Sequence, residues 1–285
     1  MSTKISWVIN PDGTPGETWN PVSGCTKVSP GCAHCYAEGI AKRFWGSREF
    51  GDVQCHEDRL EQPLHWKKPR SIFVNSMSDL FHRDVPMKFI DRVLDIISAC
   101  PRHTFMVLTK RPELISEKLY DHAGGCCGRD LAPGDYYPNL WLGTSVEDQQ
   151  RAERIPDLLR ATYQMEVHFL SVEPMLRPVD VAKWLGGSPA WTGKDSGLPR
   201  PLAAALESMP DLPAVPGIDW VICGCESGPS ARPMDIDWVR SLRDQCVAAG
   251  TPFFLKQMMV DGKLVHMPEL DGRVWDQRPQ PTDTP

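Results

Sequence analysis

Six short apolar runs recur along this chain, and each of them ends in a cluster of polar residues. They are SIFVNSMSD (71–79), HTFMVLTKR (103–111), LWLGTSVED (140–148), VHFLSVEP (167–174), DWVICGCES (219–227) and PFFLKQ (252–257). Runs of Val, Ile, Leu and Phe of this length indicate strands that are buried on both faces. Segments with helical spacing lie between them, such as residues 87–97 after Pro86, and proline suits the first turn of a helix.

The repeated order of strand, polar cluster and helix is typical of parallel βαβ units, in which helices cover a buried sheet. The polar residues follow the carboxyl ends of the strands, which is the edge where α/β barrels and doubly wound sheets bind ligands. GETWNPVSG (16–24) supplies a first strand. We therefore predict an α/β protein that forms a partial (β/α) barrel of TIM type with about six or seven parallel strands.

A single domain over residues 1–258 accounts for these units, with an insertion or lid at 186–217, where six Pro and five Gly occur. Residues 259–285 form a C-terminal extension, and after His266 the chain becomes polar and rich in proline, so a frayed tail is expected. No run of eighteen apolar residues occurs, and no apolar stretch follows a basic N-terminal segment. We therefore expect a cytoplasmic protein without a membrane span or a signal peptide.

The charge is distributed unevenly along the chain. The net charge of −6 argues against a surface that coats nucleic acid, which would require an excess of basic residues. Residues 1–112 nevertheless carry 15 Lys and Arg against 12 Asp and Glu, whereas the rest of the chain carries 16 against 25. The basic residues of the first third form either a basic opening or an ordinary solvated surface.

Three of the ten cysteines lie within eleven residues, CTKVSPGCAHC, as Cys25, Cys32 and Cys35. Cytosolic thiols stay reduced, so a metal site or catalysis is favoured over disulfides. A structural zinc site requires four ligands, and the fourth would have to come from a distance, as from Cys55 or His56. A 4Fe-4S cluster on three thiolates leaves one iron open to an exogenous ligand. On spacing alone, three interpretations stay open: a zinc site, an iron–sulfur site, or thiols in a loop without a metal.

The cysteine motif resembles that of radical S-adenosylmethionine enzymes, in which three cysteines after the first strand of a partial barrel bind a 4Fe-4S cluster. The usual spacing there is CxxxCxxC, whereas six residues separate Cys25 from Cys32, and His34 occupies a position that is usually aromatic. Other segments resemble a phage-associated, radical-SAM-like family of unknown function over residues 5–258. They are WNPVSGCTKVSPGCAHCYAE, IFVNSMSDLFHRDVP, TFMVLTKRPE, WLGTSVEDQ, RIPDLL, FLSVEP, DWVICGCESGPSARPM and PFFLKQ. More loosely, SMSDLF and VLTKR resemble spore photoproduct lyase-like proteins.

The resemblance implies a second cofactor, S-adenosylmethionine, whose amino and carboxylate groups bind the open iron and whose cleavage yields a 5′-deoxyadenosyl radical after reduction by an external electron donor. It also implies cofactor contacts at the strand ends: His34 beside the cluster, Ser76, Ser78 and Asp79 for the ammonium group, Lys110 for the carboxylate, and Ser145, Glu147 and Glu173 for ribose or ammonium. Each has a structural alternative. Asp79 could cap a helix, the two serines could satisfy a turn, and Lys110 and Arg111 could be solvated.

Cys223, Cys225 and Glu226 are candidates for catalysis at the end of the sixth predicted strand, DWVICGCES. The two cysteines are two residues apart on a strand, so they face the same side, where they would act as a hydrogen donor or ligate a metal, or pack as buried structural thiols. Cys126 and Cys127 could join them in a second metal site. The functions that remain are a radical-SAM enzyme acting on a nucleotide or nucleic acid, a zinc-stabilised nucleic-acid-binding module, and an electron-transfer protein.

Overall fold

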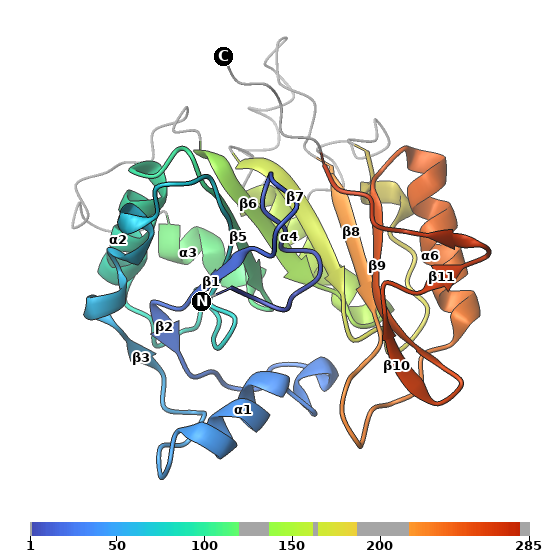
Figure 1. Cartoon of the computed structure of the whole chain (residues 1–285), viewed down its shortest axis with the longest axis horizontal. Helices are drawn as coiled ribbons and strands as arrows, with labels where there is room; N and C mark the ends of the chain where they lie inside the picture. The colour runs from blue at the N-terminus through green and yellow to red at the C-terminus, as the bar shows by residue number, and fades with distance from the viewer. Residues whose placement is uncertain (1, 120–136, 162–164, 187–216, 280–285) are drawn as a thin grey trace, which may run out of the picture.

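The computed structural model describes residues 2–119, 137–161, 165–186 and 217–279. Its centre is one eight-stranded sheet that curls into a half-barrel (Figure 1). In sheet order its strands are β1 (Glu17–Trp19), β4 (Ser71–Val74), β5 (Thr104–Thr109), β6 (Tyr137–Ser145), β7 (Met165–Val172), β8 (Trp220–Gly224), β9 (Phe253–Val260) and β10 (Lys263–His266). The strands from β1 to β9 are parallel, and β10 is antiparallel to β9. The predicted partial TIM-type barrel is confirmed.

Helices cover the outer face of the sheet (Figure 1). They are α2 (Met87–Ser98), α3 (Ile115–Leu119), α4 (Arg154–Ala161) and α6 (Ile236–Ala249). Helix α2 follows Pro86, as predicted, and buries five apolar side chains between Phe89 and Ile97. Each such side chain contributes about 1.5–3 kcal/mol when it is removed from water. Helix α6 begins at the cap Asp235 and ends at Gly250, whose left-handed φ of 69° suits glycine.

Shorter elements connect the strands and the helices. The one-turn helices are η1 (Pro30–Cys32), η2 (Glu57–Arg59), η3 (Gln62–His65), η4 (Pro112–Leu114), η5 (Gln149–Glu153) and η6 (Ala182–Trp184). Helix α1 (Tyr36–Phe44) and the small strand pair β2 (Val22–Ser23) and β3 (Gln54–Cys55) lie at the lower end of the molecule in Figure 1. This is the edge where the parallel strands end.

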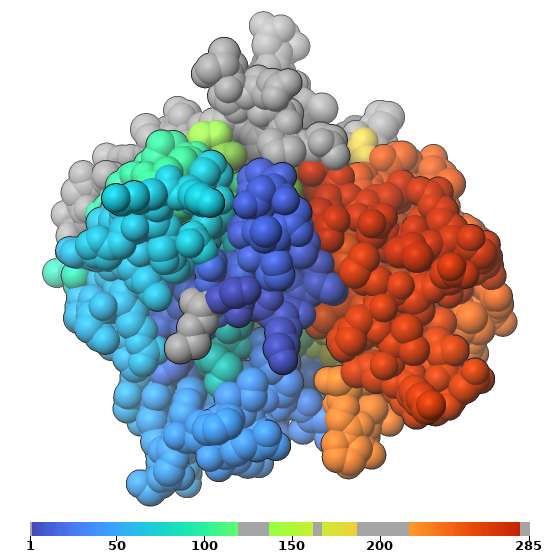
Figure 2. Space-filling view, in the orientation of Figure 1, coloured from blue at the N-terminus to red at the C-terminus, as the bar shows by residue number. Residues whose placement is uncertain are grey.

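The N-terminal segment, residues 2–16, fills the inner face of the half-barrel. Trp7 packs against Phe73, Phe169 and Trp220, with ring centroids 5.0 to 6.0 Å apart. Figure 2 shows this segment, in dark blue, between residues of the first third of the chain and the C-terminal elements. Arg278 donates a hydrogen bond to the carbonyl of Ser6 and so joins the two ends of the described chain. The inside of the half-barrel is therefore a packed core and not a pore.

The C-terminal extension continues the fold as far as residue 279. Strand β10 forms a hairpin with β9, and β11 (Glu269–Leu270) pairs with β12 (Arg273–Val274). Trp275 packs on Phe253 with its centroid 6.0 Å away. The expected frayed tail is therefore not seen for residues 267–279, because their few apolar side chains cover the end of the sheet. Residues 280–285 lie outside the described part.

The predicted insertion at 186–217 lies mostly outside the described residues, but its two ends are placed. Leu185 pairs with Ile218 in a parallel bridge, and the amide of Ile218 donates to the carbonyl of Trp184. Ile218 precedes β8, so both ends lie at the amino edge of the sheet. No helix within the described ranges has the length and apolar composition that a membrane crossing requires.

Candidate functional site

The three clustered cysteines lie on one loop at the carboxyl edge of the half-barrel. The loop begins after β2, where Gly24 has a φ of 96° and an added Cβ would lie 2.3 Å from the carbonyl oxygen of Asp52. The amide of Cys25 then donates to the carbonyl of Phe50, and the chain continues through η1 into α1. All three cysteines are half-buried free thiols. The fold thus brings the motif to the edge that the sequence predicted.

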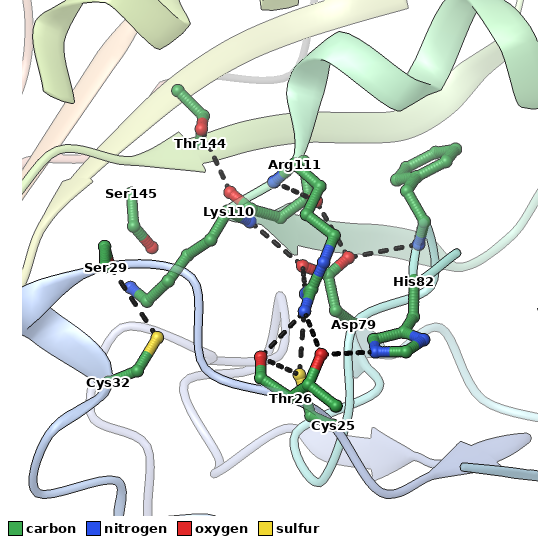
Figure 3. A network of polar contacts seen from close by, with 12 residues as sticks. Cys25, Thr26, Ser29, Cys32, Asp79, His82, Lys110, Arg111, Thr144 and Ser145 are labelled. Atoms are coloured by element: carbon green, nitrogen blue, oxygen red, sulfur yellow. Dashed lines mark hydrogen bonds and ion pairs between the residues drawn. The ribbon is translucent and has the colours of Figure 1, made fainter. Parts of the chain in front are cut away.

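Glu147, two residues after the end of β6, holds the middle of this loop. Its side chain is fully buried, and it accepts hydrogen bonds from Ser29 Oγ at 2.6 Å and Arg154 Nη1 at 2.8 Å. Lys110 Nζ lies 3.2 Å from Glu147 Oε1, and Figure 3 shows the lysine reaching from β5 toward Ser29. Gly31 packs so closely on Glu147 that an added Cβ would lie 2.4 Å from Oε1.

The charge balance around Glu147 keeps it ionised. Burial acts to raise the pKa of this carboxyl, but Lys110 and Arg154 together with the Ser29 hydroxyl outweigh burial, so its pKa lies below the ordinary value. Ser29 Oγ also lies 3.7 Å from Cys32 Sγ. Glu147 is therefore an anchor between strand β6 and the cysteine loop, and its oxygens are already occupied by the chain.

A second network holds Cys25 from the ends of β4 and β5 (Figure 3). Arg111 Nη1 donates to Cys25 Sγ at 3.5 Å and to Asp79 Oδ2 at 3.0 Å. Its Nη2 donates to the carbonyl oxygen of Thr26 at 2.7 Å and to Thr26 Oγ1 at 3.0 Å. Thr26 Oγ1 in turn lies 2.8 Å from His82 Nε2. Sequence reasoning allowed Arg111 to be solvated, but it is only 4% exposed.

Asp79 is saturated by hydrogen bonds from the chain. Its Oδ1 accepts from the amide of Phe81 at 3.1 Å and from Thr109 Oγ1 at 2.8 Å, and its Oδ2 accepts from the amide of Lys110 at 3.0 Å as well as from Arg111. The side chain is 6% exposed. These contacts favour a role in joining β4 to β5 over direct contact with a ligand.

The serines predicted beside Asp79 are also bound to the chain. Ser76 Oγ donates to Asn20 Oδ1 at 3.1 Å, and Ser78 Oγ donates to the carbonyl of Val22 at 2.9 Å. The carbonyl of Ser76 accepts a bond of 2.6 Å from the Tyr36 hydroxyl. Ser145 is 1% exposed, and its carbonyl accepts from Arg154. In these contacts the hydroxyls of Ser76 and Ser78 satisfy the turn backbone or its neighbours, which was the structural alternative.

Two ion pairs line the edge beyond β7. Glu173, after β7, pairs with Lys256 of β9. Glu226, after β8, accepts two hydrogen bonds from the Arg232 guanidinium, and Arg232 Nη2 also donates to the carbonyl of Pro30 in the cysteine loop at 2.9 Å. Burial acts to raise the pKa of Glu226, but Arg232 holds it below the ordinary value. His34 is exposed on the same loop and contributes to that lowering.

Cys223 and Cys225 are both buried, and the charge of Glu173 acts on both thiols. Val221 and Cys223 belong to the core between the sheet and its helices, whereas Trp220 and Ile222 belong to the inner core. Cys223 Sγ lies 3.8 Å from Met175 Sδ, and burial raises the pKa of this thiol well above its ordinary value. This placement favours the structural alternative for Cys223 over a donor that faces the interior.

The pairing of β8 with β9 shifts register after Cys223, so the period-two argument does not extend to Cys225. Cys225 is 1% exposed, and burial together with the charge of Glu173 raises its pKa to about 11. Cys126 and Cys127, the other members of a predicted second metal site, lie outside the described residues.

The donor set suits an iron–sulfur cluster in number and chemistry. Burial and then Asp79 raise the pKa of the Cys25 thiol to about 11, while Arg111 acts against them. Thiolates are soft ligands that select Fe–S clusters, zinc and copper(I). A zinc ion requires four ligand atoms converging at about 2.0 to 2.3 Å. Within the described ranges no group of three or more His, Cys, Asp or Glu is arranged to hold a metal ion.

The distant zinc ligands considered from the sequence have other partners. His56 Nε2 lies 2.6 Å from Ser23 Oγ. Cys55 belongs to β3, where it faces Val22 in the strand pair and packs against the outer core.

Comparison with known proteins places the chain in a family. A family model described as a protein of unknown function, DUF5131, matches residues 2–279. The chain belongs to DUF5131. No curated protein matches it. A solved structure of a spore photoproduct lyase mutant is similar over 87% of this chain and 75% of that chain, with 12% identity and a TM-score of 0.40. A likeness this weak does not bear on the activity of DUF5131 proteins, whose description assigns none.

Proposed function

We propose that this DUF5131 protein is a radical S-adenosylmethionine enzyme, with Cys25, Cys32 and Cys35 as the ligands of a 4Fe-4S cluster. The observation that carries the proposal is the placement of three half-buried free thiols on one anchored loop at the carboxyl edge of a parallel half-barrel. Three thiolates leave one iron of such a cluster for an exogenous ligand. When bound, the cluster would supply the electron that cleaves S-adenosylmethionine to methionine and a 5′-deoxyadenosyl radical.

The side chains around the loop divide into those that are fully buried and those that are partly exposed. Asp79 and Glu147 are buried and saturated, so we assign both to holding the loop. Lys110 pairs with Glu147 but is 22% exposed at its side chain, so we assign its ammonium group to the carboxylate of S-adenosylmethionine. Glu173 pairs with Lys256 and is 18% exposed, and we assign it to the ammonium group or the ribose hydroxyls. His34 remains proposed as a neighbour of the cluster.

The substrate class that we propose is a nucleotide or a nucleic acid. Helix α1, which follows Cys35 directly, exposes Lys42 and Arg43 together with Phe44, which is 71% exposed. A cation next to an exposed aromatic ring suits the phosphate and the base of a nucleotide. Glu226 and the ion pair of Glu173 with Lys256 face the same edge as the cysteine loop, and Glu226 is proposed to contact the substrate.

Anaerobic reconstitution with iron and sulfide tests the cluster and separates it from the zinc-stabilised binding module. We expect about four iron and four sulfide per chain, and an electron paramagnetic resonance signal of the reduced protein that changes when S-adenosylmethionine is added. Cys25→Ala, Cys32→Ala or Cys35→Ala should lose the iron. Cys100→Ala and Cys246→Ala, which remove thiols from the outer core, are the matched controls and should retain it.

Two results would contradict the proposal. One is zinc without sulfide in the purified protein, which would support the binding module. The other is a full complement of iron and sulfide in all three of the loop variants.

A further inference from the structure

Arg111 is a buried cation that touches one of the three loop cysteines. It directly follows β5, and its guanidinium spans from Asp79 to the backbone and side chain of Thr26 (Figure 3). The Nη1 atom lies 3.5 Å from Cys25 Sγ, which is within hydrogen-bond range for a sulfur acceptor. Four contacts thus fix the position of this charge relative to the sulfur.

The Nη1 atom of Arg111 donates to both Cys25 and Asp79, so the guanidinium is shared between the sulfur and a carboxylate. Asp79 also accepts hydrogen bonds from three further donors, and its negative charge acts on Cys25 against the positive charge of Arg111. His82 approaches Thr26 from the other side, and burial and then Arg111 lower its pKa, so it is neutral near pH 7. Cys32 Sγ lies 3.7 Å from the Ser29 hydroxyl, and the exposed Lys27 interacts with Cys32 and Cys35 through its charge. The loop therefore presents its three sulfurs in unequal electrostatic environments.

We propose that Arg111 sets the electron affinity of the site through Cys25, as a positioning residue for the redox step. This inference rests on the proposed function. A cation and an N–H donor beside a ligand sulfur stabilise the state that carries one more electron, and charge and hydrogen bonds to the sulfurs are recognised determinants of Fe–S potentials. The electron comes from an external low-potential one-electron donor. Neither Arg111 nor Cys25 gains or loses a proton in this step.

The test is a reductive titration of the reconstituted protein with dithionite, followed by electron paramagnetic resonance. We expect Arg111→Gln to lower the midpoint potential by at least 59 mV, which is a tenfold change in the equilibrium constant of a one-electron reduction. Arg111→Lys keeps the positive charge, so its midpoint potential should lie between those of Arg111→Gln and the wild type. Arg70→Gln is the control, because Arg70 pairs with Glu17 at the amino edge of the same sheet and should leave the potential unchanged.

The possible outcomes separate this inference from the function on which it rests. If the wild-type protein assembles no cluster, both fall. If Arg111→Gln carries a full cluster whose midpoint potential equals that of the wild type, the inference about Arg111 is overturned and the proposed function is not. If Arg111→Gln fails to fold, the midpoint potentials of Arg111→Lys and Asp79→Asn test the inference instead. Asp79→Asn removes a negative charge from the same network and should raise the potential, and the absence of a shift in both variants overturns the inference.

Discussion

Gly31 provides the sharpest test of how the cysteine loop is held. In the structure an added Cβ would lie 2.4 Å from Glu147 Oε1 and 2.5 Å from its Cγ. Ordinary contacts of a Cβ begin about 1 Å further out, and Glu147 cannot give way because three donors fix its carboxylate. Gly31→Ala must therefore displace the loop, and overpacking of this kind costs about 1–3 kcal/mol. Because Cys32 is the next residue, we also expect less iron after reconstitution.

Gly39→Ala is a matched control in the same region. Gly39 lies inside α1, and an added Cβ there meets nothing within 4 Å. Alanine is favoured over glycine in a helix interior by about 0.5–1 kcal/mol, so this variant should be more stable than the wild type and bind iron normally. Urea unfolding measures both changes. Equal stability and equal iron content in the two variants would refute the packing of the loop on Glu147.

Three further changes test the networks around the loop. Asp79→Ala leaves the Arg111 guanidinium buried without its carboxylate, so unfolding in urea should show a loss of about 3–5 kcal/mol; a loss below about 1 kcal/mol would contradict the buried pair. The pKa of Glu147 is lower in the folded chain than its ordinary value of 4.5. The ionised carboxylate therefore contributes fully to the free energy of unfolding above about pH 4.5, and this contribution is lost as the pH falls through the pKa of the folded state. The stability gap between the wild type and Glu147→Gln should therefore narrow below about pH 4.5, and a gap that widens in acid would refute the assignment. Lys110→Ala should weaken binding of S-adenosylmethionine, measured by calorimetry on the reconstituted protein, with iron content unchanged; unaltered affinity would return Lys110 to a structural role.

The strands and the position of the cysteine loop follow from the sequence because each rests on a local pattern. Apolar runs of four to eight residues bury both faces of a parallel strand, and the polar residues after them must lie at the carboxyl edge. The loop reaches that edge because it follows β1 and β2 directly. These inferences need no knowledge of how distant segments pack.

The roles of individual side chains could not be predicted in the same way, because they depend on partners that are far apart in the chain. Asp79 and Arg111 are 32 residues apart, and Cys25 is 86 residues from Arg111. Nothing in the sequence indicates that Arg111 is buried, since TKRP also suits an exposed turn. On β8 both faces are apolar, so alternation alone does not tell which side Cys223 faces.

Formation of 5′-deoxyadenosine tests the central claim most directly. The reconstituted and reduced protein, incubated with S-adenosylmethionine and without its substrate, should release 5′-deoxyadenosine slowly, because an open iron and a bound cofactor suffice for unproductive cleavage. The product is measured by chromatography with mass detection, with Cys32→Ala as the negative control. A wild-type protein that carries a full, reducible cluster and yet yields no 5′-deoxyadenosine, with or without added nucleotides, would contradict the account and support a cluster that only transfers electrons.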